Sequence, residues 1–114
     1  MSESGWIGVD LDGTLAVYGV WDGGIGEPIP LMVERVKKWL ADGVEVKIFT
    51  ARVCFSGDEK FMLEQMNLIE SWCEKHIGQK LQVTATKDFR MIELWDDRAI
   101  QIIPNTGKRA DGQL

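Results

Sequence analysis

The chain has 114 residues, a length that predicts a single domain spanning residues 1–114. Hydrophobic residues make up 45% of it and charged residues 27%, an ordinary globular composition that excludes a disordered or fibrous chain. The formal net charge is −5, and residues 1–34 hold six acidic residues and no Lys or Arg. Because binding to a nucleic-acid backbone depends mainly on Lys and Arg, this distribution argues against general nucleic-acid binding and favours a cation as partner.

Short apolar runs rich in β-branched residues predict five strands, at residues 6–11, 44–50, 81–84, 91–95 and 100–103. Between the first three, apolar residues at helical spacing predict two helices, one over 31–42 and one that follows a capping box of Ser56 and Glu59 and ends at Gly78. Strands that alternate with helices imply a parallel sheet. The expected fold is an α/β domain with a parallel five-stranded sheet and flanking helices.

Two segments are predicted to lack regular secondary structure. Residues 15–30 contain four glycines and two prolines, too many for a helix, so we expect an irregular flap with a small hairpin. Residues 104–114, which begin at Pro104, are expected to form a C-terminal tail.

Cysteine content and hydropathy predict where the protein works. Cys54 and Cys73 are too few for a disulfide framework, which favours a reducing compartment. The first residues do not form a basic targeting segment, and no apolar run approaches the ~18 residues of a membrane span. We therefore expect a soluble, cytoplasmic protein that does not bind membranes.

Polar side chains follow three of the predicted strands: Asp10 and Asp12, then Thr50, then Asp96 and Asp97. The carboxyl ends of parallel strands meet at one edge of a sheet, where open α/β folds keep their sites. Asp10 and Asp12 point the same way along a strand, so they repel unless a cation or a shared proton lies between them. Four carboxylates without a cluster of His or Cys suit Mg²⁺ better than zinc.

These residues lie in segments that resemble the four motifs of the haloacid dehalogenase superfamily, in that family's order. The segments are residues 9–15 (VDLDGTL), residues 48–52 (IFTAR), Lys87, and residues 95–99 (WDDRA). Residues 96–100 also look like a segment of small proteins of this type that are common in bacteriophages. The resemblance implies a Rossmannoid fold, and residues 15–30 and 85–90 are too short to form the cap domain that larger members carry.

The activity that the resemblance implies is magnesium-dependent hydrolysis of a small phosphomonoester. Asp10 matches the nucleophile, which would form an aspartyl-phosphate, and Asp12 matches the general acid/base. Thr50 matches a hydroxyl that binds a phosphoryl oxygen, and Lys87 a cation that neutralises the transferring group.

The resemblance also implies the ligands of the metal and of the substrate. Asp10, Asp96 and the backbone carbonyl of Asp12 would hold Mg²⁺, and Asp97 would bind it through water or support its ligands. Leu11, Gly13 and Arg52, within the matching motifs, are expected to bind substrate.

Lys87 is the weakest match, since only three residues separate it from the strand at 91–95, too few for a crossover helix. Arg52 and Arg90 are the alternatives for the phosphate-binding cation.

Without a cap domain, the site should be open unless a second subunit of a homo-oligomer covers it. The nearby groups able to grip a leaving group are aromatic: Tyr18 and Trp21 on the flap, and Phe55. Aromatic side chains lose little conformational entropy on binding, so they suit this role.

Two other functions use similar residues. Receiver domains of signalling proteins are of this size and combine clustered acids, a Thr and a Lys with Mg²⁺. They carry adjacent acids on the first strand and the phosphoacceptor on a later one, whereas this chain has the spaced pair first and the adjacent pair last. A fold of the haloacid dehalogenase type retained for binding alone is the third hypothesis, and the motifs show no broken position that would favour it.

Overall fold

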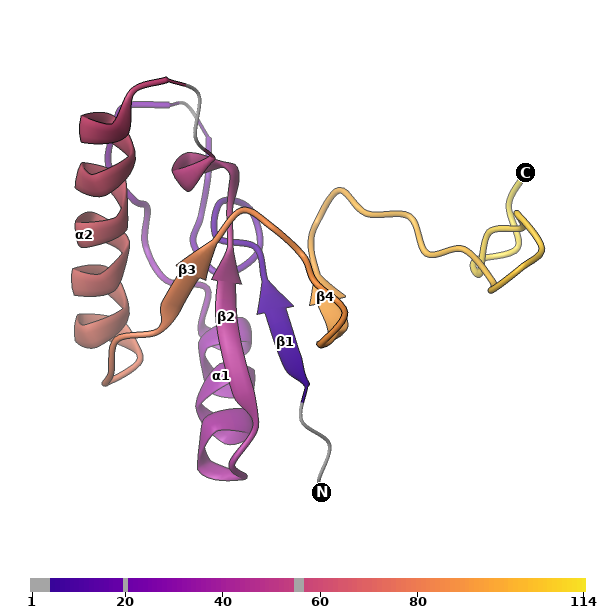
Figure 1. The fold of residues 1–114 in the computed structure, drawn as a ribbon. Coiled ribbons are helices and arrows are strands. Elements are labelled where there is room, and N and C mark those ends of the chain that lie inside the picture. Colours follow the sequence, from indigo (N-terminus) through magenta and orange to yellow (C-terminus); the bar gives the residue numbers. More distant parts are fainter. Residues whose placement is uncertain (1–4, 20, 55–56) are drawn as a thin grey trace.

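The computed structural model describes residues 5–19, 21–54 and 57–114 (Figure 1). Its parallel sheet has four strands in the order β3-β2-β1-β4. The strands are β1 (Trp6–Val9), β2 (Glu45–Phe49), β3 (Gln82–Thr84) and β4 (Met91–Trp95). The helices are α1 (Pro30–Ala41), the 3₁₀ turn η1 (Ala51–Val53) and α2 (Glu59–His76). This arrangement is a Rossmann-like α/β fold and confirms the predicted parallel sheet.

Both long helices contribute to one core on the same face of the sheet. The connections β1-α1-β2 and β2-α2-β3 run in the same direction across the sheet, and right-handed crossovers then place both helices on one side. Alternate strand residues point into this core, with Ile7 and Val9 on β1 and Ile48 on β2 buried against Val36 of α1 and Ile69 of α2. Neither helix has an apolar stretch long enough to cross a lipid bilayer, and the same holds for the rest of the described chain.

The prediction of a fifth strand at 100–103 is wrong. Ile102 forms an isolated antiparallel bridge with Arg109, and the Ala110 N–H donates to the Gln101 carbonyl oxygen at 2.9 Å. The turn between them contains Asn105, with φ of 66°, and reverses the chain. The segment therefore pairs with the residues that follow it, and Figure 1 shows it, in yellow, away from the sheet.

The start of α2 differs from the predicted capping box. Asp58 is the N-cap, and its side chain accepts a hydrogen bond from the Phe61 N–H at 3.0 Å. Glu59 is consequently the first residue of the helix. Ser56, the predicted cap, lies outside the described residues, as does Phe55.

The flap at 15–30 contains the small hairpin that its composition predicted. The Val17 N–H donates to the Glu27 carbonyl and the Ile29 N–H to the Leu15 carbonyl, both at 2.8 Å. At Gly26 the paired segments are so close that an added Cβ would lie 2.0 Å from the Val17 carbonyl oxygen. A side chain at Gly26 is therefore incompatible with this hairpin.

Gly26→Ala should lower the thermal stability of the protein, because the hairpin must open to admit the methyl group. We expect a loss of about 1–3 kcal/mol in the free energy of unfolding, measured by thermal or urea denaturation. Gly19→Ala is the matched control, since nothing lies within 4 Å of a Cβ at Gly19. Equal stability of the two variants would contradict the close approach.

Candidate functional site

Three carboxylates lie together at the carboxyl edge of the sheet. Asp10 follows β1, and Asp96 and Asp97 follow the adjacent β4. The Asp10 N–H donates to the Trp95 carbonyl at 2.9 Å, which continues the pairing of the two strands to the edge. Carboxylate oxygens of the three residues all lie within 4.8 Å of one another. An oxygen-only group of this size fits a hard divalent cation.

Burial and the neighbouring carboxylates shift the pKa values of Asp10 and Asp97. Burial raises the pKa of Asp10 to about 7, and the hydrogen bond to Asp97 and the charges of Asp96 and Asp97 act in the same direction. Burial also acts to raise the pKa of Asp97, but hydrogen bonds from Thr14 and Asp10 outweigh it and hold that pKa below its usual value. The surroundings of Asp10 therefore favour its protonated form, and a bound cation would favour its charged form.

Gly13 allows the loop after β1 to approach Asp97. Its φ is 91°, and an added Cβ would lie 2.7 Å from an Asp97 carboxylate oxygen. The next residue, Thr14, donates from its hydroxyl to Asp97 Oδ1 at 2.9 Å and accepts from the Asp97 N–H at 3.0 Å. The loop therefore fixes the orientation of one of the three carboxylates.

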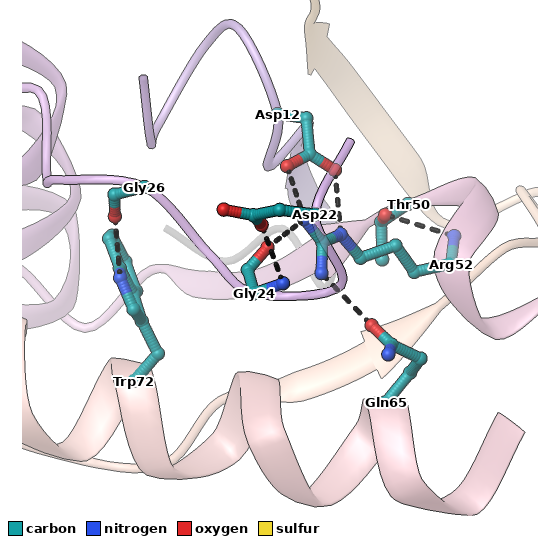
Figure 2. A network of polar contacts seen from close by, with 8 residues as sticks. All are labelled: Asp12, Asp22, Gly24, Gly26, Thr50, Arg52, Gln65 and Trp72. Carbon is teal, nitrogen blue, oxygen red and sulfur yellow. Dashed lines mark hydrogen bonds and ion pairs between the residues drawn. The ribbon is translucent and has the colours of Figure 1, made fainter. Parts of the chain in front are cut away.

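We expected four carboxylates to lie together, but the Asp12 carboxylate has a different partner from the other three. Its carboxylate pairs with Arg52, whose Nε donates to Oδ2 and whose Nη2 donates to Oδ1, both at 2.8 Å (Figure 2). The side chain is thereby neutralised by a cation of the protein itself. Among the described residues, the cluster of carboxylates that could hold a metal consists of Asp10, Asp96 and Asp97.

Thr50 lies between β2 and η1 at the same edge. Its N–H donates to the Thr84 carbonyl at 2.9 Å, and its hydroxyl oxygen accepts from the Arg52 N–H at 3.2 Å. The residue is buried to 3% exposure, and these two bonds fix it at the end of the strand. The alternation of β2 therefore delivers a hydroxyl where the sequence predicted it.

A cleft of about 620 Å³ opens over this edge of the sheet. It brings together nine predicted site residues with four others, and its lining is Asp10, Asp12, Gly13, Tyr18, Trp21, Phe49, Thr50, Ala51, Arg52, Phe61, Asp96, Asp97 and Arg98. Phe55 lies outside the described residues, so its predicted contact with substrate stays a prediction.

Two predicted site residues lie elsewhere. Leu11 is fully buried in the core. Lys87 is exposed on the connection between β3 and β4 and is not among the described residues that line the cleft, so its role stays a prediction. Arg90, an alternative cation, pairs with Glu45 at 3.1 Å.

Besides Phe49 and Ala51, which lie in a matching motif, three residues of this region had no predicted role. Arg98 and Phe61 line the cleft, and Gln65 is buried beneath it, where its Oε1 accepts from Arg52 Nη1 at 3.0 Å. Phe61 and Gln65 are four residues apart, so they share one side of α2. The sequence signal that could have indicated Gln65 is its spacing from Met62 and Ile69, which places a polar residue on the apolar side of the helix.

Comparison with known proteins supports the fold. No family model matches the chain, and no curated protein does. Among solved structures, it is similar to a conserved protein coded by a locus of Bacteroides thetaiotaomicron, with a TM-score of 0.60 and 22% sequence identity. The alignment covers 90% of this chain and 84% of the other. At this identity the similarity shows the shared α/β fold alone.

Proposed function

We propose that this chain is a magnesium-dependent phosphomonoesterase of the haloacid dehalogenase type, without a cap domain. The observation that carries the proposal is the cleft in which Asp10, Asp96 and Asp97 lie close together beside Asp12 and Thr50. The motif resemblance assigns each of these residues a role in one reaction. The aspartyl-phosphate route divides a difficult hydrolysis into two easier steps.

The residues that would hold the metal fit Mg²⁺ by their chemistry. Asp10 and Asp96 offer carboxylate oxygens, and Asp97, in the same cluster, would bind through water or support the other ligands. The motif resemblance adds the backbone carbonyl of Asp12. When bound, Mg²⁺ would offset the repulsion among the carboxylates and polarise a phosphoryl oxygen.

Proton and group transfer are assigned to two aspartates. The Asp10 carboxylate attacks phosphorus. Asp12, once it has exchanged one of its hydrogen bonds to Arg52 for a proton, donates that proton to the oxygen of the departing alcohol. Asp12 then accepts a proton from the water that hydrolyses the aspartyl-phosphate, which releases phosphate and restores Asp10. Thr50 Oγ1 accepts from Arg52 N–H, which leaves its hydroxyl hydrogen to donate to a phosphoryl oxygen.

The open cleft places aromatic side chains at its mouth. Tyr18, Trp21 and Phe61 are each more than 40% exposed, and Arg98 adds a cation beside the three carboxylates. These groups would contact the alcohol part of the substrate and the phosphoryl charge. The substrate class is therefore a small phosphomonoester with an apolar or aromatic leaving group.

Hydrolysis of a nitroaryl phosphate, measured by the appearance of nitrophenolate, tests this function. Activity should require millimolar Mg²⁺ and fall by at least about 100-fold in excess chelator, because the carboxylates then repel the phosphate. Full activity in excess chelator would contradict the metal role.

The same assay separates the two alternatives. A receiver-like module would take up about one phosphoryl group per chain without further turnover, and a binding protein would release no product. Many turnovers per chain exclude both.

A further inference from the structure

Within the described chain, β4 forms an edge of the sheet that has no neighbouring strand on its outer side. The Trp95 carbonyl accepts from the Asp10 N–H on the β1 side, and the backbone groups of successive strand residues point to opposite sides. Those of Leu94 therefore point to the free edge. The Ile92 and Leu94 side chains are 55% and 38% exposed. Unpaired N–H and C=O groups flanked by exposed apolar side chains are suited to bind another strand.

The C-terminal hairpin, which we define as residues 100–110, has a free edge of its own. The hydrogen bonds of the bridge between Ile102 and Arg109 are made by the residues on either side of these two. The N–H and C=O groups of Ile102 therefore point to the opposite side of the hairpin. Three isoleucines of this strand are between 43% and 55% exposed: Ile100, Ile102 and Ile103.

The turn after β4 directs the C-terminal hairpin away from the edge of its own sheet. The Asp97 N–H donates to Thr14 Oγ1 at 3.0 Å. The Arg98 N–H donates to Asp96 Oδ1 at 2.7 Å. These bonds fix the direction of the chain where β4 ends, and Figure 1 shows the hairpin, in yellow, away from the sheet. A second chain can bring its hairpin to the free edge without any change in this turn.

Charge and size both favour a second copy of this chain as the occupant of the edge. Residues 88–97, which include β4, contain four acidic residues and one basic residue, whereas residues 98–114 contain three basic residues and one acidic residue. The hairpin of one chain thus complements the edge of another in charge. The strand β4 and residues 98–114 together supply about 20 residues in each chain, at the lower end of the ~20–30 on each side of a stable interface.

We propose that the protein forms a symmetric dimer in which the C-terminal hairpin of each chain adds to the β4 edge of the other. The partner's strand at 100–103 takes the position next to β4 and extends the sheet to five strands. The partner's isoleucines cover Ile92 and Leu94. Each chain gives one hairpin and receives one, so the two contacts are equivalent. This assembly does not require the proposed enzymatic function.

Sedimentation equilibrium of the full chain tests whether the dimer forms. We expect a dimer at about 100 μM, because interfaces of this size have Kd values that range from micromolar to much lower. A monomer at this concentration would overturn the proposal.

Two substitutions test the two sides of the contact. Ile102→Pro removes the N–H that points to the free edge of the hairpin, and it lies outside the sheet, so the fold should be kept. Leu94→Lys places a positive charge on the edge where the basic hairpin would dock. Each should raise the dimer Kd at least about 10-fold, since each change occurs in both halves of the dimer. Leu31→Lys is the matched control: Leu31 is a 62% exposed residue of α1, and its replacement should leave the Kd unchanged.

The pattern of effects distinguishes this dimer from other pairings. Two β4 strands paired with each other would be sensitive to Leu94→Lys alone, and two paired hairpins would be sensitive to Ile102→Pro alone. An unchanged Kd in Ile102→Pro would therefore overturn the proposal, as would an unchanged Kd in a folded Leu94→Lys chain. In the double variant the two losses should not add, because both changes remove the same contact. Additive losses would place the two residues in separate contacts and would also overturn it. If circular dichroism shows that Leu94→Lys does not fold, the wild type and Ile102→Pro decide the outcome.

Discussion

Asp10→Asn should reduce hydrolysis of a nitroaryl phosphate by on the order of 10³-fold or more, because an amide cannot act as the nucleophile that forms the aspartyl-phosphate. The loss should appear in kcat. It should also occur without unfolding, since the neutral amide removes a half-buried acid whose pKa is raised to about 7 by burial and by its neighbours. The melting temperature of the variant without metal should equal or exceed that of the wild type.

Asp42→Asn provides the matched control for this prediction. Asp42 is an exposed acid that pairs with Lys38 at the end of α1, at 3.4 Å, and its loss should change neither turnover nor stability appreciably. Activity of Asp10→Asn within a few-fold of the wild type would exclude Asp10 as the nucleophile. Trapping of a phosphorylated wild-type chain, and not of the Asp10→Asn chain, would identify the intermediate directly.

The strands of the sheet could be predicted from sequence because each of the four has an apolar run with a defined end. Residues 91–95 were predicted without error, and the predicted ranges of the other three strands contain the observed ones. The segment 100–103 has the same local pattern but pairs, within the part of the chain that the structure describes, with the residues that follow the turn at Asn105 and not with the sheet. Local pattern does not reveal which partner a strand will find.

The cluster of three carboxylates could be predicted from the topology of the sheet. The hydrogen bonds of Arg52 to Asp12 and Gln65 could not. Asp10, Asp96 and Asp97 end adjacent parallel strands, so the topology brings them together. The pairing of Asp12 with Arg52 joins residues 40 positions apart and depends on how η1 turns after Thr50. The sequence therefore predicted Arg52 at the site, and its role in substrate binding stays a prediction, but the sequence did not reveal its ion pair with Asp12.

Binding of Mg²⁺ should raise the melting temperature, because the cation relieves the repulsion among Asp10, Asp96 and Asp97. At a concentration 100 times the Kd, a ligand that binds only the folded state stabilises it by about 2.7 kcal/mol. For a domain of this size that corresponds to an increase of about 10 °C in Tm. Differential scanning fluorimetry from zero Mg²⁺ to well above the Kd would measure it, with Asp96→Asn expected to lose most of the response and Asp42→Asn to keep it.

The effect of pH on this stabilisation follows from the direction of the pKa shifts. The pKa of Asp10 is about 7 in the folded protein, against an ordinary value of 3.8 for the unfolded chain, so between these values the folded state holds a proton that the unfolded chain has released. The stability that Asp10 contributes is complete below about pH 4 and is lost as the pH rises through 7. The pKa of Asp97 is lowered, so its contribution has the opposite sign and is lost only as the pH falls through that lowered value. Between pH 5 and 8 the change from this pair therefore comes from Asp10: the metal-free protein loses stability from this group, while Mg²⁺ competes with fewer protons. The increase in Tm caused by Mg²⁺ should accordingly be larger at pH 8 than at pH 5.5, and an equal or smaller increase at pH 8 would show that the cation does not bind through Asp10.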